Sequence, residues 1–196
     1  MYIDNGSPES GMKLIKLLQT AANDDKSAES QFFYYLADDM QAVCNRYLKD
    51  QNDAEDAFVK GFFNFFKKIK QYKFQTDSDV RAYIYMVMRN ACVDIAREKY
   101  LEVKLIPVEN ATEVSYSPDV YEKLDLEEII KLINQLPVKY RTVFNMYSVD
   151  GMSHAEIAKA LGISEDASAT QLKRARVFLK ELIIKNGLSH ARDKKK

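Results

Sequence analysis

Residues near the C-terminus combine a turn signal with a cluster of positive charge. Ser153 and Glu156 have the spacing of a capping box, in which the serine hydroxyl accepts from the glutamate N–H and the glutamate side chain reaches back. Gly162 follows where the chain must turn sharply, and Ser164 can cap a second helix, which carries the basic cluster 173–176. This layout is typical of a helix-turn-helix that binds duplex DNA, with an ordinary αα-hairpin as the alternative.

The outward face of that second helix is predicted to enter the major groove. Its inner face is marked by an apolar stripe that includes Leu172, Ala175 and Leu179. Outward cations suit phosphates, Ala or Thr can contact a thymine methyl group, and Glu or Asp can accept from a cytosine amino group. The two acidic residues equally suit the positive end of the helix dipole. The predicted DNA contacts are Glu165, Asp166, Ala169, Thr170, Lys173, Arg174 and Arg176.

No residue pattern in the sequence is typical of an enzyme or a metal site. We find no Gly-rich phosphate loop and no nucleophile with a matching base. Cys44 and Cys92 lack CxxC spacing and lie in apolar helical patterns, so we expect buried free thiols. His154 and His190 have no partner at ligand spacing. We therefore expect no catalytic residue, no metal and no cofactor.

The elements that would position these residues are helices. Gly and Pro are few, at 6 and 4 residues, which favours long helices over a many-turned β-sandwich. Residues 101–121 lose the helical period, and a structureless loop of that length is unusual inside one domain. We therefore predict an all-α fold with two small helical domains, 12–100 and 122–185, joined by a flexible linker. Apolar spacing predicts the helices 12–22, 28–49, 53–72 (capped by Asp53), 80–100, 124–136, 139–149, 153–161 and 164–182.

Charge is strongly segregated along the chain, although the formal net charge is +0. Residues 1–56 and 101–138 have net charges of −6 and −5, whereas residues 57–100 and 139–196 have +5 and +6. Two separate basic segments suit two contacts with one polyanion. No apolar run is long enough to span a bilayer and the N-terminus lacks the pattern of a secretory signal, so we expect a cytoplasmic protein without membrane insertion.

Three segments resemble the sigma-70 family. DAEDAFVKGFFNFFKKI (53–69) looks like the region 2 helix of that family, and VRAYIYMVMRNACVDIAREK (80–99) is similar to its promoter-melting helix. The second match includes Arg81, Asn90 and Arg97, with Tyr83 in a position usually held by Trp. The segment LPVKYRTVFNMYSVDGMSHAEIAKALGISEDASATQLKRARVFLKEL (136–182) is similar to region 4. A linker in place of region 3 marks the extracytoplasmic-function (ECF) group.

The resemblance implies a sigma factor that binds core RNA polymerase, through its β′ clamp helices and β flap, and directs it to promoter DNA. It leaves open whether an anti-sigma factor is a further partner. The second C-terminal helix would bind the −35 element. The implied polymerase contacts are Asp53, Ala54, Glu55, Asp56 and Phe62. The implied contacts with the −10 element are Tyr72, Phe74, Arg81, Tyr83, Arg89, Asn90 and Arg97.

Two other functions share parts of this pattern. A helix-turn-helix regulator would keep the C-terminal domain without binding polymerase. A sigma-like antagonist would keep the family fold without initiating transcription. The second helix departs from the residues usual in region 4 at Asp166, Ala167 and Ala169, which keeps the sigma-like antagonist open as an alternative.

Overall fold

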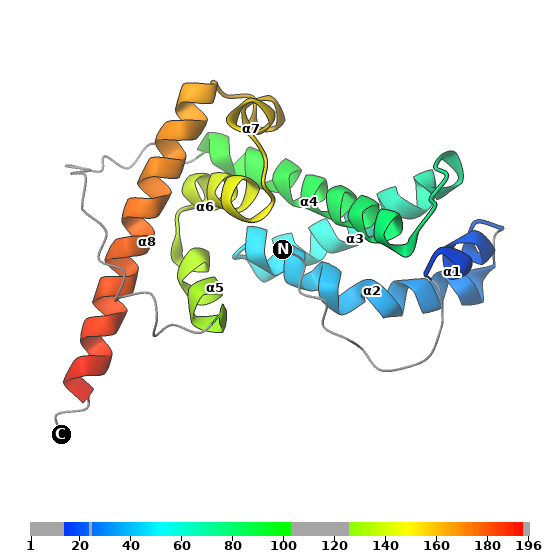
Figure 1. The fold of residues 1–196 in the computed structure, drawn as a ribbon, viewed down its shortest axis with the longest axis horizontal. Coiled ribbons are helices and arrows are strands. Elements are labelled where there is room, and N and C mark those ends of the chain that lie inside the picture. Colours follow the sequence, from blue (N-terminus) through cyan, green and yellow to red (C-terminus); the bar gives the residue numbers. More distant parts are fainter. Residues whose placement is uncertain (1–13, 24, 103–125, 194–196) are drawn as a thin grey trace.

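The computed structural model describes residues 14–23, 25–102 and 126–193, which form helices and no strand (Figure 1). The all-α prediction is confirmed for this part of the chain. The predicted linker lies outside the described residues from position 103 onward. The N-terminal half contains α1 (Leu14–Ala21), α2 (Lys26–Tyr47), α3 (Gln51–Lys68), the 3-10 turn η1 (Ile69–Gln71) and α4 (Asp77–Glu102). The C-terminal half contains α5 (Leu126–Gln135), α6 (Val138–Phe144), the π-helical turn η3 (Asn145–Val149), α7 (His154–Leu161) and α8 (Glu165–Asp193).

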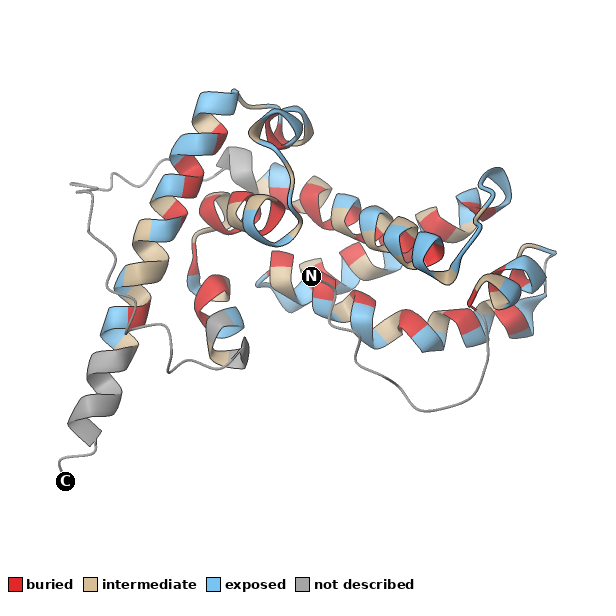
Figure 2. Ribbon diagram, viewed as in Figure 1, coloured by how far each residue is buried: buried red, intermediate tan, exposed pale blue. Residues whose placement is uncertain are grey.

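An aromatic core holds the N-terminal half together. Phe32 of α2 stacks on Phe65 of α3 with ring centroids 5.2 Å apart, and both rings are fully buried. Figure 2 shows the buried residues along the facing sides of α2, α3 and α4. Helices α3 and α4 pack closely at Gly61, where an added Cβ would lie 2.4 Å from the sulfur of Met88. The absence of a side chain at Gly61 therefore sets the spacing of these two helices.

The starts of α3 and α4 differ from the prediction, and side-chain caps explain both. Asp50, not Asp53, caps α3, since its carboxylate accepts from the N–H groups of Asn52 and Asp53 at 3.0 and 3.2 Å. The prediction of Asp53 as the cap was wrong. Helix α4 begins three residues early because Thr76 and Asp79 form a reciprocal cap: the Asp79 carboxylate accepts from Thr76 N, and the Thr76 hydroxyl accepts from Asp79 N.

The C-terminal half packs α6 and α7 against one side of the long helix α8. Leu136, Tyr140 and Ala175 are buried together, and Phe178 lies beside Tyr140 at a centroid distance of 5.5 Å. The predicted helix 139–149 is in fact α6 followed by a π-helical turn. The last helix runs well beyond the predicted end at residue 182, to Asp193.

The two halves also contact each other, because α6 and α7 pack on α4 and α5 packs on α2. One apolar core runs through both halves, joining residues such as Val43 and Met88 to Val143 and Met146. Cys44 and Cys92 are buried and free, as predicted. A hydrogen bond with Cys44, followed by burial, raises the pKa of the Cys92 thiol, which keeps it protonated and unreactive. No described helix is both long and apolar enough to cross a membrane.

Candidate nucleic-acid interface

The helix-turn-helix has the predicted geometry at each of its signal residues. Ser153 N donates to the Glu156 carboxylate at 2.8 Å, and Glu156 N donates to the Ser153 hydroxyl at 3.3 Å. The bond from Ser153 N, together with one from the Ser153 hydroxyl to the same carboxylate at 2.8 Å, lowers the pKa of Glu156. Gly162 is left-handed with φ +68° and is exposed, and its N–H bonds to the Ala158 carbonyl. The Ser164 hydroxyl accepts from Ala167 N at 3.1 Å and so caps α8. The predicted capping box, turn and second cap are confirmed.

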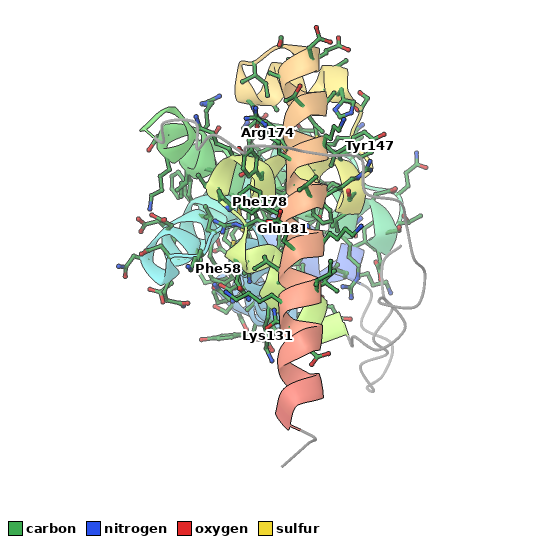
Figure 3. All side chains as sticks on the ribbon, turned by 90° about the vertical axis from the view of Figure 1, so that its left-hand side faces the viewer. Phe58, Lys131, Tyr147, Arg174, Phe178 and Glu181 are labelled. Carbon is green, nitrogen blue, oxygen red and sulfur yellow. The ribbon has the colours of Figure 1, made fainter. Side chains whose placement is uncertain are left out.

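Six of the seven predicted DNA contacts on α8 are exposed. Ser168, Leu172 and Ala175 are fully or almost fully buried on the opposite face. Arg174 is half-buried near the N-terminal end of α8, and Figure 3 shows this helix in front of the other elements. The exposed members of the predicted set are Glu165, Asp166, Ala169, Thr170, Lys173 and Arg176.

A chain of side chains that sequence analysis missed supports this face. The His154 ring shares a hydrogen bond with the buried Ser168 hydroxyl at 2.9 Å and stacks on Tyr147 at 4.6 Å. The guanidinium of Arg176 lies 5.8 Å from the centre of the same Tyr147 ring. Helix α8 is thus tied to both α7 and the π-helical turn. The position of Ser168, four residues before Leu172, was the available sequence signal that it faces inward.

In the N-terminal half, three of the predicted −10 residues form an aromatic cluster. Tyr72 and Tyr83 have ring centroids 4.3 Å apart, and Phe74 lies 5.5 Å from Tyr83. Burial, followed by a hydrogen bond with Tyr72, raises the pKa of Tyr83. Tyr72 remains 46% exposed, so one ring of the cluster is open to solvent.

The remaining four predicted −10 residues are spread along α4 and do not join this cluster. Arg81 turns toward α2, where its guanidinium donates to the Tyr35 hydroxyl at 3.0 Å and lies 3.4 Å from an Asp39 carboxylate oxygen. Arg89 donates to the Asn90 side chain at 3.4 Å. Arg97 is paired with the neighbouring Asp94 at 3.5 Å and lies roughly 24 Å along the helix from Arg81 at 1.5 Å per residue.

The predicted polymerase contacts divide into exposed and buried residues. Ala54 and Phe62 are 1% and 4% exposed, so they support α3 from within the core. Asp53 pairs with Lys99 of α4. Glu55 and Asp56 are exposed on the outer face of α3.

The same outer face of α3 carries two apolar residues that sequence analysis missed. Val59 and Phe63 are 66% and 65% exposed. Their four-residue spacing, offset from the buried stripe, was the signal that they share an outward face.

Comparisons with known proteins match both halves in order. The family model "Sigma-70 region 2" matches residues 33–100, and the model "Sigma-70, region 4" matches residues 126–179, so together they cover more than half of the chain. The ECF RNA polymerase sigma factor SigW of Bacillus subtilis (strain 168) is 26% identical over 186 residues, covering 87% of this chain and 96% of SigW. The ECF RNA polymerase sigma factor SigM of the same organism is 28% identical over 141 residues, covering 68% of this chain and 82% of SigM.

Among solved structures, CnrH in complex with the cytosolic domain of CnrY is 21% identical, with a TM-score of 0.45 and coverage of 87% of this chain and 96% of that chain. The helices described above form an all-α fold, and the family models place region 2 before region 4 in the chain. Because region 2 and region 4 follow each other in one chain that aligns with ECF sigma factors along most of their length, this chain belongs to the sigma-70 family, in its ECF group.

Proposed function

We propose that this protein binds core RNA polymerase and directs it to promoters by contacting a −35 and a −10 element. The observation that carries the proposal is the exposed N-terminal face of α8, the second helix of a capped helix-turn-helix, in a chain that also carries a region 2 domain. We assign residues 12–100 to polymerase and −10 binding and residues 122–185 to −35 binding. The protein acts through binding and is not an enzyme, and its place of action is the cytoplasm, where polymerase and chromosome are.

At the −35 element, α8 would enter the major groove of duplex DNA by its N-terminal end. Ala169 and Thr170 are exposed where they could contact thymine methyl groups, and Lys173 follows one turn later. Arg174 and Arg176 would bind phosphates, which adds affinity without sequence information. Substituting Ala169 by Lys should therefore change the −35 preference without weakening phosphate binding.

At the −10 element, the cluster of Tyr72, Phe74 and Tyr83 would hold unpaired bases. Stacking on an aromatic side chain stabilises each bound base by about 1–3 kcal/mol. Three exposed lysines lie on the adjoining end of α3 and on the loop that follows it, at positions 67, 68 and 73. Their positive charges could bind the phosphates of the DNA strand. Because Arg81 is already held by Tyr35 and Asp39, we propose that it orients the start of α4 and that phosphate contacts fall mainly to these lysines.

The polymerase contact would use the outer face of α3. Glu55 and Asp56 offer negative charge, and the exposed Val59 and Phe63 offer an apolar surface in the next turns. A rim of charge around exposed apolar side chains is the usual composition of a protein interface. The proposed partners there are the β′ clamp helices, with the β flap as the partner of the C-terminal half and an anti-sigma factor as a further partner.

Transcription in vitro with purified core polymerase tests the proposal. Core enzyme plus this protein should give promoter-specific transcripts that core alone does not, and start sites can be mapped. The double substitution Val59→Ser and Phe63→Ser should abolish co-purification with core, whereas Tyr34→Ser, which changes an exposed residue of α2 outside the proposed contacts, should not. No association with core would favour a helix-turn-helix regulator, and association without transcription would favour a sigma-like antagonist.

A further inference from the structure

A single carboxylate of the C-terminal half is enclosed by three side chains of the N-terminal half. Asp150 follows the π-helical turn, and its side chain is 1% exposed. One of its oxygens accepts from the Arg46 guanidinium at 2.9 Å and from the Tyr85 hydroxyl. The other accepts from the Tyr47 hydroxyl at 2.5 Å. Arg46 and Tyr47 end α2 and Tyr85 lies on α4, so these contacts join residues more than 60 positions apart.

The end of α2 is held by two further side chains from the C-terminal half. Arg141 donates to the Tyr47 carbonyl at 3.0 Å, and Asn145 donates to the Arg46 carbonyl at 2.9 Å. Arg141 also donates at 3.1 Å to the Asn134 and Leu136 carbonyls at the end of α5. The last carbonyls of a helix lack intrahelical partners and carry partial negative charge. Arg141, buried between two such ends, therefore links α2 to α5 although burial lowers its pKa.

The two halves are joined by the hydrogen bonds described above, but their contact also leaves buried polar atoms without partners among the described residues. The Nε atoms of Arg46 and Arg89 and the Oδ1 atom of Asn145 are buried without a hydrogen bond. A buried polar group without a partner loses its hydration without compensation. Opening the contact to water would return hydration to these atoms, which lowers the free energy needed to separate the two halves.

When the two halves dock, the C-terminal half covers part of α4, the helix proposed to hold the −10 strand. Tyr85 and Arg89 are half-buried on the side of α4 that meets α6 and α7. The charge of Arg89, after the hydrogen bonds of Ser153, helps to lower the pKa of Glu156 at the start of α7. Arg89 therefore lies near enough to α7 in the closed form for its charge to act on Glu156, and its Nε atom is buried there.

We propose that the two halves form a closed state held at Asp150 by Arg46, Tyr47 and Tyr85, and that this state competes with the binding of single-stranded DNA along α4. The competition rests on the proposed function, whereas the closed state itself does not. If only a fraction of the protein is open, its apparent affinity for the strand equals the affinity of the open form multiplied by that fraction. Residues that strengthen or weaken the Asp150 contacts then set how readily the protein binds a melted promoter.

The test uses the full-length protein with three matched variants. Asp150→Asn removes the charge with little change of shape, and Tyr85→Phe removes one hydroxyl. Asp38→Asn removes an exposed acid of α2 away from this contact and serves as the control. Small-angle X-ray scattering measures the size of the free protein, circular dichroism checks that helix content is retained, and a fluorescent oligothymidine reports strand binding, because stacking tolerates any base.

We expect wild type and Asp38→Asn to be compact, and Asp150→Asn to have a larger radius of gyration with unchanged helix content. Loss of a hydrogen bond to a charged group should raise the ratio of open to closed protein about tenfold, with a several-fold gain in oligothymidine affinity. Tyr85→Phe should show a smaller effect in the same direction. A wild type as extended as Asp150→Asn, or an Asp150→Asn variant as compact as the control, would overturn the closed state.

The second part of the proposal has its own contrary result. If Asp150→Asn opens the protein without any gain in oligothymidine affinity, the two states do not compete for DNA. If no variant binds oligothymidine at all, the strand contact under the proposed function fails, while the scattering result still decides whether the halves dock.

Discussion

The free-energy cost of replacing Gly162 depends on the backbone conformation at this residue and on the space around its Cβ position. Its φ of +68° lies in the left-handed region, where an L residue other than Gly is strained by about 1–2 kcal/mol. No atom beyond the adjacent chain lies within 4 Å of a Cβ built at this position, so an added methyl group meets no neighbour. Strain is thus the whole cost in the folded state, and overpacking contributes nothing.

We expect Gly162→Ala to lower the free energy of unfolding by about 1 kcal/mol. The strain is partly offset because Ala reduces the conformational freedom of the unfolded chain by about 0.4–1 kcal/mol. Gly162→Val should cost more, because a β-branched residue tolerates positive φ poorly, and Gly162→Asn should cost less than Ala. Urea unfolding measures these differences, and a loss of 1 kcal/mol corresponds to a shift of about 2–4 °C in Tm for a chain of this size.

Gly151 provides a matched comparison, since its φ is +70° and its Cβ position is equally open. Ala at either glycine should have a similar effect. A cost well above about 3 kcal/mol at Gly162 alone would mean that the side chain meets a neighbour. An Ala variant as stable as wild type, or an Asn variant less stable than Ala, would refute the left-handed turn.

Three other changes have outcomes that the structure predicts. Gly61→Ala should lower the free energy of unfolding by about 1–3 kcal/mol, because the new Cβ would overlap Met88, and the loss should shrink in a Met88→Ala background. Arg176→Ala should reduce the salt dependence of DNA binding by about one unit of slope for the lost phosphate contact, whereas Lys185→Ala, farther along α8, should leave the slope unchanged. The lowered pKa of Glu156 means that its ionised form stabilises the fold above its ordinary pKa of 4.5, and that this contribution is lost as pH falls through the folded-state pKa. The difference in melting temperature between wild type and Glu156→Gln should therefore be constant near neutral pH and shrink in acid; a difference that grows in acid would contradict the assigned sign.

Local signals in the sequence were sufficient for the C-terminal motif. The caps at Ser153 and Ser164 and the turn at Gly162 form hydrogen bonds only with residues up to four positions away in the sequence. They therefore follow from residue type and spacing. The errors at Asp53 and at the start of α4 have the same local origin. Thr76 and Asp79 have capping-box spacing, but Asp in place of Glu or Gln hides the pattern, and Asp50 and Asp53 both suit a cap.

The contacts between the halves could not be predicted in this way. Arg46 and Asp150 are 104 positions apart, and neither periodicity nor spacing relates them. Phe62 illustrates a second limit, because a family motif names a position without stating whether its side chain faces solvent or core. The buried Phe62 and the exposed Phe63 are neighbours, and only the packing of α3 separates their roles.

The π-helical turn makes one short segment responsible for two surfaces. Asn145, at its start, bonds to the end of α2, and Tyr147, two residues later, stacks between His154 and Arg176. The turn is closed by the bond from Asp150 N to the Asn145 carbonyl at 2.9 Å, so its residues shift together. The proposed phosphate contact at Arg176 and the closed contact at Asp150 therefore both depend on the placement of this one turn.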